Sequence, residues 1–140
     1  MFYPATFTAA PEGGYVVTFR DIPEAITQGE TEDEALAMAA DVLLSAMGFY
    51  FDDRRQVPLP SPLRAGERQI ALPASVWAKV LLLNELVAAR VSNSDLARRL
   101  GTRPQEVNRI VDLAHATKID TLDRALGVLG KRIEISVAAV

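Results

Sequence analysis

Four polar residues in one short segment could form hydrogen bonds with the edges of DNA bases: Arg103, Gln105, Asn108 and Arg109. Arginine pairs with guanine in the major groove, and asparagine or glutamine pairs with adenine, each through two hydrogen bonds. On a helix this spacing leaves the four side chains on the outward face, with Asp112 at its margin. The sequence therefore predicts a surface that reads duplex DNA.

Three further cationic residues flank this segment and suit phosphate groups. Arg98 and Arg99 precede the segment, and Lys118 follows it. Phosphate contacts position a protein on a duplex and make its affinity depend on salt, but they carry no base preference. We expect these three residues to strengthen binding to any duplex.

The sequence offers little for catalysis or metal binding. It has no cysteine and a single histidine, His115, which argues against thiolate and zinc sites and fits a reducing cytoplasm. No serine, cysteine or carboxylate is fixed beside His115 by sequence, so a phosphate contact or a capping role explains it better than general-base catalysis. We expect no cofactor, no metal and no enzymatic activity.

The predicted base-reading residues lie on the second of two short helices. Ser92 and Asp95 predict a capping box at the start of the first helix, and Gly101 predicts its end. Thr102 and Gln105 predict a second capping box one residue later. Small or apolar residues that would pack the pair together are Leu96, Ala97, Leu100, Val107 and Ile110. This pattern is typical of a helix-turn-helix. The alternative is a helical hairpin with a merely solvated polar face.

Two longer helices are predicted around this pair. The first is predicted at residues 73–90, where helical spacing gives one apolar face made of Val76, Val80, Leu83 and Val87. The second is predicted at residues 118–130, and the side chains on its inward face are Ile119, Leu122, Leu126 and Leu129. Short strands are predicted at residues 69–72 and, from the alternation of apolar side chains, at residues 133–137. Because an uncovered strand edge invites association, we expect the terminal strand to pair with residues 69–72 or with its copy in a second subunit.

The N-terminal half predicts three strands and one helix. Apolar side chains alternate in residues 3–7 and 15–19 around a glycine-containing turn, which predicts a β-hairpin, and residues 25–28 predict a third strand. Thr31 and Glu34 predict a capping box at the start of a helix. The apolar stripe of that helix is expected to be Leu36, Ala39, Ala40, Leu43, Met47 and Tyr50. This half is therefore predicted to be a βββα unit.

A proline-rich segment separates the two halves. Residues 57–62 read Val-Pro-Leu-Pro-Ser-Pro, which cannot continue a helix. We expect a stiff linker at residues 57–66 between an N-terminal domain of residues 1–56 and a C-terminal domain of residues 67–140.

Charge also differs between the halves. Residues 1–60 contain ten acidic and three basic side chains, whereas residues 61–140 contain eight acidic and twelve basic ones. Opposite signs predict two surfaces for two different partners. The apolar runs are too short for a membrane span and the N-terminus lacks a signal-peptide pattern, so no membrane association is expected.

Taken together, these motifs resemble the HicB antitoxins of the HicAB type II toxin–antitoxin systems, in the subclass with a C-terminal helix-turn-helix. The resemblance covers nearly the whole chain. In the N-terminal half it rests on Tyr3-Pro4-Ala5, Gly13-Gly14-Tyr15, Phe19-Arg20-Asp21-Ile22-Pro23, Thr27-Gln28-Gly29-Glu30-Thr31 and Glu34-Ala35. In the C-terminal half it rests on Leu96-Ala97-Arg98-Arg99-Leu100-Gly101 and His115-Ala116-Thr117-Lys118-Ile119-Asp120. One departure follows the second strand, where the family's Pro-Asp-x-Pro-Gly pattern is replaced by Arg20-Asp21-Ile22-Pro23-Glu24-Ala25.

The resemblance implies an α+β protein with two functions. It implies that a partial RNase H-like N-terminal domain binds and blocks a small RNA-cleaving toxin of the HicA type. It further implies that the complex represses its own operon through a Cro/repressor-like C-terminal domain. The acidic N-terminal half independently suits a basic RNA-binding partner. By charge and loop position we expect toxin contacts at Asp21, Glu24, Glu30 and Asp33. Reading two half-sites about 34 Å apart would require a homodimer or a higher homo-oligomer.

Two alternatives remain at this level. An RNase H-like nuclease would hold two metal ions with clustered carboxylates, and the only candidates are Asp21, Asp41, Asp52 and Asp53. Solvated surface charge explains these aspartates more simply. The second alternative is a DNA-binding regulator whose N-terminal half senses a small molecule. Co-purification of a small basic protein would favour the antitoxin, and its persistent absence would favour the sensor.

Overall fold

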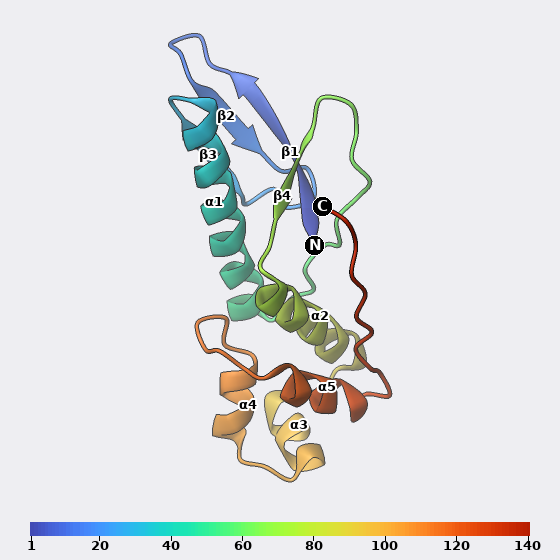
Figure 1. Cartoon of the computed structure of the whole chain (residues 1–140). Coiled ribbons are helices and arrows are strands. Elements are labelled where there is room, and N and C mark those ends of the chain that lie inside the picture. Colours follow the sequence, from blue (N-terminus) through green and yellow to red (C-terminus); the bar gives the residue numbers. More distant parts are fainter.

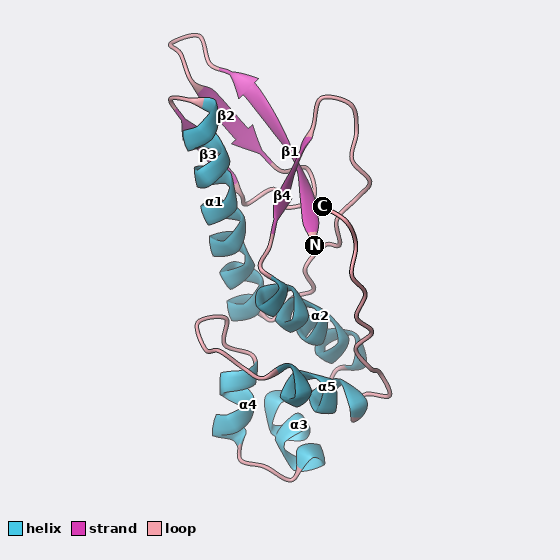
Figure 2. Ribbon diagram, viewed as in Figure 1, coloured by secondary structure: helices cyan, strands magenta, loops and turns pink.

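The computed structural model describes residues 1–140 as a mixed α+β fold with a four-stranded antiparallel sheet and five helices (Figure 1). The strand order in the sheet is β3-β2-β1-β4. The strands are β1 Phe2–Ala9, β2 Tyr15–Thr18, β3 Ile26–Gly29 and β4 Arg68–Ala71. Figure 2 shows the strands at one end of the molecule and α3, α4 and α5 at the other. The α+β class predicted from sequence is confirmed.

The predicted β-hairpin forms between β1 and β2, with Phe7 opposite Val17. Its turn depends on two glycines with positive φ angles, 102° at Gly13 and 78° at Gly14. A Cβ atom on Gly14 would also lie 2.5 Å from the carbonyl oxygen of Gly29 in β3. Glycine at position 14 therefore allows the hairpin turn and the close approach of β3.

Helix α1, Glu32–Asp53, packs on one face of the sheet (Figure 1). Its N-terminus is capped as predicted by the Thr31 hydroxyl, which accepts a hydrogen bond from the Glu34 backbone N–H at 3.1 Å. The Glu34 carboxylate accepts a hydrogen bond from the backbone N–H of Glu30 and not from that of Thr31. The buried stripe is Ala35, Ala39, Leu43, Ala46, Met47 and Tyr50. Of the residues predicted for it, Leu36 is only half-buried and Ala40 is exposed.

By length and hydropathy alone, α1 could cross a membrane. In this structure its buried stripe contacts the sheet, chiefly β3, and its first turn is acidic. The helix of a soluble core satisfies the same length and hydropathy test.

Strand β4 extends the N-terminal sheet, since it pairs antiparallel with β1 and places Ile70 opposite Tyr3. We expected this strand in the C-terminal domain. The structure places it in the N-terminal sheet because Ile70 and Leu72 are buried in the core beneath β1 and α1.

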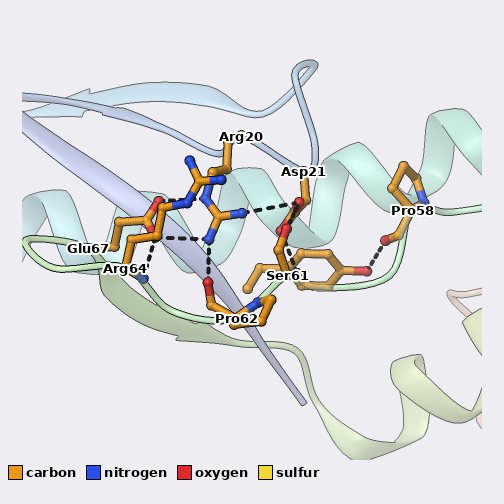
Figure 3. A network of polar contacts seen from close by, with 8 residues as sticks. Arg20, Asp21, Pro58, Ser61, Pro62, Arg64 and Glu67 are labelled. Atoms are coloured by element: carbon orange, nitrogen blue, oxygen red, sulfur yellow. Dashed lines mark hydrogen bonds and ion pairs between the residues drawn. The ribbon is translucent and has the colours of Figure 1, made fainter.

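The proline-rich segment is fixed to the sheet domain by polar contacts (Figure 3). The Tyr3 hydroxyl donates to the Pro58 carbonyl oxygen at 2.7 Å, and the Ser61 backbone N–H donates to the Asp21 carboxylate at 2.9 Å. Arg20 donates to the Pro62 carbonyl oxygen at 2.5 Å and forms an ion pair with Glu67 at 2.8 Å. The segment has no regular secondary structure and is held against the sheet domain along its length.

Helix α2, Ala74–Ala89, belongs to two hydrophobic cores. Its side chains in the core of the sheet domain are Val76, Val80 and Leu83. On another face, Leu82 and Leu86 lie in the core formed with the C-terminal helices. Only the first of these faces was predicted from helical spacing. Because α2 contributes to both cores, it joins the sheet to the C-terminal helices.

The C-terminal helices are α3 Asn93–Leu100, α4 Pro104–Ile110 and α5 Ile119–Gly127. Helix α5 is shorter than predicted, and Ile119, expected to face inward, is 45% exposed. The predicted terminal strand is absent, because residues 131–140 have no regular secondary structure and pair with no strand. The last anchored position is Ile133, whose N–H donates to Asp123 at 2.8 Å. A strand here would need a partner that one chain does not supply.

Candidate nucleic-acid interface

A tight turn joins α3 to α4. Gly101 ends α3 in the left-handed region with φ 68°, and the N–H of Thr102 donates to the Ala97 carbonyl oxygen at 2.9 Å. Leu96 and Val107 are fully buried where the two helices meet. The predicted capping box of Ser92 and Asp95 is present at the start of α3. Caps, turn glycine and apolar contacts therefore fix the orientation of α4.

Helix α4 begins differently from the prediction. Its N-cap is Arg103 without a side-chain hydrogen bond, so the capping box of Thr102 and Gln105 does not form. Pro104 occupies the first helical turn, where its fixed φ favours the helix and its missing N–H costs nothing. The Gln105 side chain is exposed and is left free by this arrangement.

The residues predicted to read bases are all exposed: Arg103, Gln105, Asn108 and Arg109. Two of them already have intramolecular partners. The Asn108 amide oxygen accepts a hydrogen bond from Asn93 at 3.3 Å, and Arg109 forms an ion pair with Glu106 at 3.1 Å. Both contacts are solvent-exposed and weak, so the two side chains can exchange these partners for others.

The residues predicted to meet phosphates occupy three positions around α4. Arg98 forms an ion pair with Asp95 at 2.7 Å, and this contact lowers the pKa of the Asp95 carboxyl. Arg99 is exposed at the end of α3, and Lys118 is the exposed N-cap residue of α5. All three side chains face solvent from the C-terminal helices.

A polar hollow of about 520 Å³ lies between α4 and α5. It is lined by four basic or titratable side chains, Arg109, His115, Lys118 and Arg124, and by one carboxylate, Glu106. Hydroxyl groups are supplied by Thr102, Thr117 and Thr121. Cationic and hydroxyl side chains together are the usual partners of phosphate oxygens. This cationic hollow, as we call it below, therefore extends the candidate interface from α4 to α5.

Sequence reasoning missed Arg124 and the threonines of this hollow. The inward positions Leu122 and Leu126 indicated that Arg124 faces outward, but they gave no information on its neighbours. The packing of α5 beside α4 brings Arg124 to the same hollow as Arg109. That relationship is tertiary and leaves no local signal in the sequence.

The structure separates the four predicted toxin contacts into two groups. Asp21 accepts hydrogen bonds from the Ser61 N–H and hydroxyl, and Glu24 accepts one from the Tyr50 hydroxyl at 2.5 Å. Burial and this bond from Tyr50 to Glu24 raise the pKa of Tyr50 to about 12. Glu30 and Asp33 are exposed beside the start of α1. Asp21 and Glu24 thus already stabilise the fold, whereas Glu30 and Asp33 are exposed to solvent.

Glu30 also lines a second hollow, of about 640 Å³, beside the β1–β2 turn. Two further carboxylates that sequence reasoning did not select, Glu12 and Glu34, lie on it. The sheet end of the molecule therefore presents an acidic surface made by the hairpin turn, the end of β3 and the first turn of α1.

The aspartates considered for metal catalysis do not converge. Asp41, Asp52 and Asp53 are exposed residues of α1, and Asp21 is bound to Ser61 in the loop after β2. No group of three or more histidine or carboxylate side chains is arranged to hold a metal ion. The geometry gives no support to a nuclease site.

Comparison with known proteins identifies the family. Residues 2–81 match a family described as the HicB-like antitoxin of bacterial toxin–antitoxin systems. The chain is also 56% identical over 135 residues to Antitoxin HicB 2 of Photorhabdus laumondii, covering 96% of this chain and 95% of that protein. The chain belongs to the HicB-like antitoxin family.

Other HicB antitoxins match over nearly the full length. The antitoxin HicB of Escherichia coli strain K12 is 51% identical over 96% of this chain and 98% of its own length. The antitoxin HicB of Pseudomonas fluorescens is 41% identical over 99% of this chain and 96% of its own length. The family match ends within α2, so it includes β4 and the pinned proline-rich segment. A HicB antitoxin belongs to a toxin–antitoxin system, which implies a toxin as partner.

Proposed function

We propose that this HicB antitoxin binds and neutralises a small RNA-cleaving toxin of the HicA type and represses its own operon. In this proposal the sheet and α1 form a partial RNase H-like domain that binds the toxin without cleaving RNA. Helices α3 and α4 form a helix-turn-helix of the Cro/repressor type that binds operator DNA. The cytoplasm, where toxin, mRNA and operator meet, is the proposed site of action.

The observation that carries the DNA-binding proposal is the surface of α4. Its exposed side chains include two arginines, a glutamine and an asparagine, which are the residue types that pair with guanine and adenine. The cationic hollow between α4 and α5 lies beside Arg109 and suits the adjacent phosphates. Base-reading and phosphate-binding groups therefore occupy one continuous surface.

A single module of this size buries too little DNA for tight and specific binding, so two copies are required. We propose a homodimer, or a higher homo-oligomer, that reads half-sites about 34 Å apart. The exposed terminal segment is the proposed dimer contact, because Ile135 and Val137 are 77% and 98% exposed in one chain. Apolar side chains this exposed gain stability when a second subunit covers them.

The acidic end of the sheet domain supports the toxin-binding proposal. Glu12, Glu30 and Glu34 surround one hollow, and Asp33 is exposed beside it. A protein that cleaves RNA needs a basic substrate surface, and an acidic partner can cover that surface by complementary charge. This end lies away from α4 (Figure 1), so toxin and DNA can occupy the protein together.

Two measurements on the full-length protein test the proposal. In the first, the purified chain is added to the product of the neighbouring short open reading frame and RNA cleavage is followed. Stoichiometric inhibition is expected, and undiminished cleavage would contradict the antitoxin role. In the second, promoter DNA from the same locus is titrated and the molar mass of the complex is measured. Two or more chains per operator are expected, and removal of residues 131–140 should weaken that assembly.

A further inference from the structure

Lys79 is the only charged residue whose side chain is buried in the chain, with 4% of its surface exposed. It lies on α2, and its ammonium group donates to three backbone carbonyl oxygens. The distances are 3.2 Å to Arg109, 2.6 Å to Asp112 and 2.5 Å to His115. A buried ammonium is costly unless its donors are satisfied, and here all three protons have an acceptor.

The three carbonyl groups share one place in the fold. Arg109 is in the last turn of α4, and its carbonyl oxygen also accepts a hydrogen bond from the Asp112 backbone N–H at 3.2 Å. Asp112 and His115 lie in the segment of residues 111–118 that joins α4 to α5. A cation at a helix C-terminus is favoured by the helix dipole as well as by these hydrogen bonds. The ammonium group of Lys79 therefore holds together the end of α4 and the connection that follows it, through its three hydrogen bonds.

This connection carries residues of the cationic hollow. His115, Thr117 and Lys118 line it from the α4–α5 segment, and Arg109 lines it from α4. Lys79 itself is held by α2, whose neighbouring side chains Val76 and Val80 are buried in the core of the sheet domain. The position of the hollow is thus set by a side chain from a helix that belongs to both cores.

We propose that Lys79 is a positioning residue for DNA binding: it makes no contact with DNA but holds the α4–α5 connection so that Lys118 and the hollow that it lines meet phosphate groups. The proposal rests on the proposed operator binding. It predicts that loss of the Lys79 ammonium removes phosphate contacts made by other residues. The number of such contacts is measurable, because the logarithm of the binding constant falls with the logarithm of salt concentration by about 0.9 per neutralised phosphate.

The test compares the salt dependence of operator binding in the full-length protein and in Lys79→Met, which keeps the side-chain length and removes the charge. We expect the slope of Lys79→Met to be smaller by about 0.9 to 1.8, equivalent to one or two lost contacts. Arg64→Met is the control, because it removes a positive charge from an exposed position in the segment before β4, which belongs to the sheet domain. An unchanged slope in Lys79→Met, with affinity lowered or not, would overturn the proposal.

Two further variants distinguish positioning from loss of stability. Lys118→Met removes one proposed phosphate contact directly, and its effect should be largely absent in the Lys79→Met background, since residues acting through one another are not additive. Lys79→Arg keeps the charge and two or more donors and should recover part of the slope. Additive effects of Lys79→Met and Lys118→Met would contradict the proposal.

A measurement without DNA separates this inference from the proposed function. Amide hydrogen exchange of residues 111–118 should be faster in Lys79→Met than in the parent protein, while exchange in the strands stays unchanged. Unchanged exchange at residues 111–118 would overturn the positioning role even where operator binding is normal. If the parent protein fails to bind its own promoter while exchange responds as expected, the operator-binding proposal is the one that fails.

Discussion

Asn84 on α2 and Val57 at the start of the proline-rich segment are joined by two reciprocal hydrogen bonds. The Val57 N–H donates to the Asn84 side-chain oxygen at 2.7 Å, and the Asn84 side-chain nitrogen donates to the Val57 carbonyl oxygen at 3.0 Å. Val57 is 2% exposed, so water does not replace these bonds. This pair fixes the segment that follows α1 to the helix that enters the C-terminal core.

Replacing Asn84 by leucine should lower the free energy of unfolding by about 2–4 kcal/mol, because the N–H and carbonyl of Val57 would remain buried without partners. Denaturant titration followed by circular dichroism measures this loss. Asn93→Leu is the control, since its hydrogen bond to Asn108 is exposed and should contribute less than about 1 kcal/mol. Equal losses in the two variants would show that the buried pair does not stabilise the junction.

The Arg20–Glu67 contact predicts a specific acid sensitivity. Hydrogen bonding from Arg20 holds the pKa of Glu67 below its ordinary value of 4.5. A carboxyl whose pKa is lowered by folding contributes stability above its ordinary pKa, and the contribution is lost as the pH falls through the lowered folded value. Between about pH 5 and pH 3, the parent protein should therefore lose more stability than Glu67→Gln.

Thermal unfolding at a series of pH values measures the difference. Glu12→Gln, at the exposed β1–β2 turn, is the control and should follow the parent protein across the same range. Parallel pH profiles for Glu67→Gln and the parent would show that the ion pair to Arg20 makes no contribution to the fixed position of residues 57–66.

The left-handed backbone of the α3–α4 turn can be tested at Gly101, with Gly127 in α5 as the control. Gly101 has φ 68°, and a Cβ atom there would meet nothing within 4 Å, so Gly101→Ala isolates the cost of the left-handed backbone. We expect destabilisation by about 1 kcal/mol. Gly127 is helical and equally open, so Gly127→Ala should stabilise the protein by about 0.5–1 kcal/mol. A stabilising Gly101→Ala would contradict the turn geometry.

Several features that depend on neighbouring residues could be predicted from the sequence, although the capping box expected of Thr102 and Gln105 does not form. The Ser92 capping box, the Thr31 cap and the end of α3 at Gly101 each involve residues within a few positions of one another. The β1–β2 hairpin belongs to the same class, because its turn glycines adjoin both strands.

Features that depend on distant residues could not be predicted. The pairing of Tyr3 with Ile70 joins segments more than sixty residues apart, and no local pattern identifies β1 as the partner of β4. The burial of Lys79 and the presence of Arg124 beside Arg109 follow from the packing of helices. The predicted strand near Ile135 lacks a partner within one chain, so alternation alone was not sufficient to form it.

The toxin-binding surface is predicted to centre on Glu30 and not on Asp21. Glu30→Lys should weaken toxin binding about tenfold or more by placing like charges together, with little change in melting temperature. Asp21→Ala should instead lower the free energy of unfolding by about 1–3 kcal/mol, because Ser61 loses its acceptor. Calorimetric titration with toxin and thermal unfolding separate the two effects. Full toxin affinity in Glu30→Lys would place the toxin elsewhere on the domain.

The most direct test of the account is the discrimination between operator and scrambled duplex DNA by Gln105→Ala and Arg99→Ala, measured by fluorescence anisotropy at one salt concentration. If α4 reads bases, Gln105→Ala should weaken operator binding by about 1–3 kcal/mol and leave binding to the scrambled duplex nearly unchanged. Arg99→Ala should weaken both similarly, because phosphate contacts carry no base preference. An equal loss on both duplexes for Gln105→Ala would contradict the assignment of α4 as the reading helix.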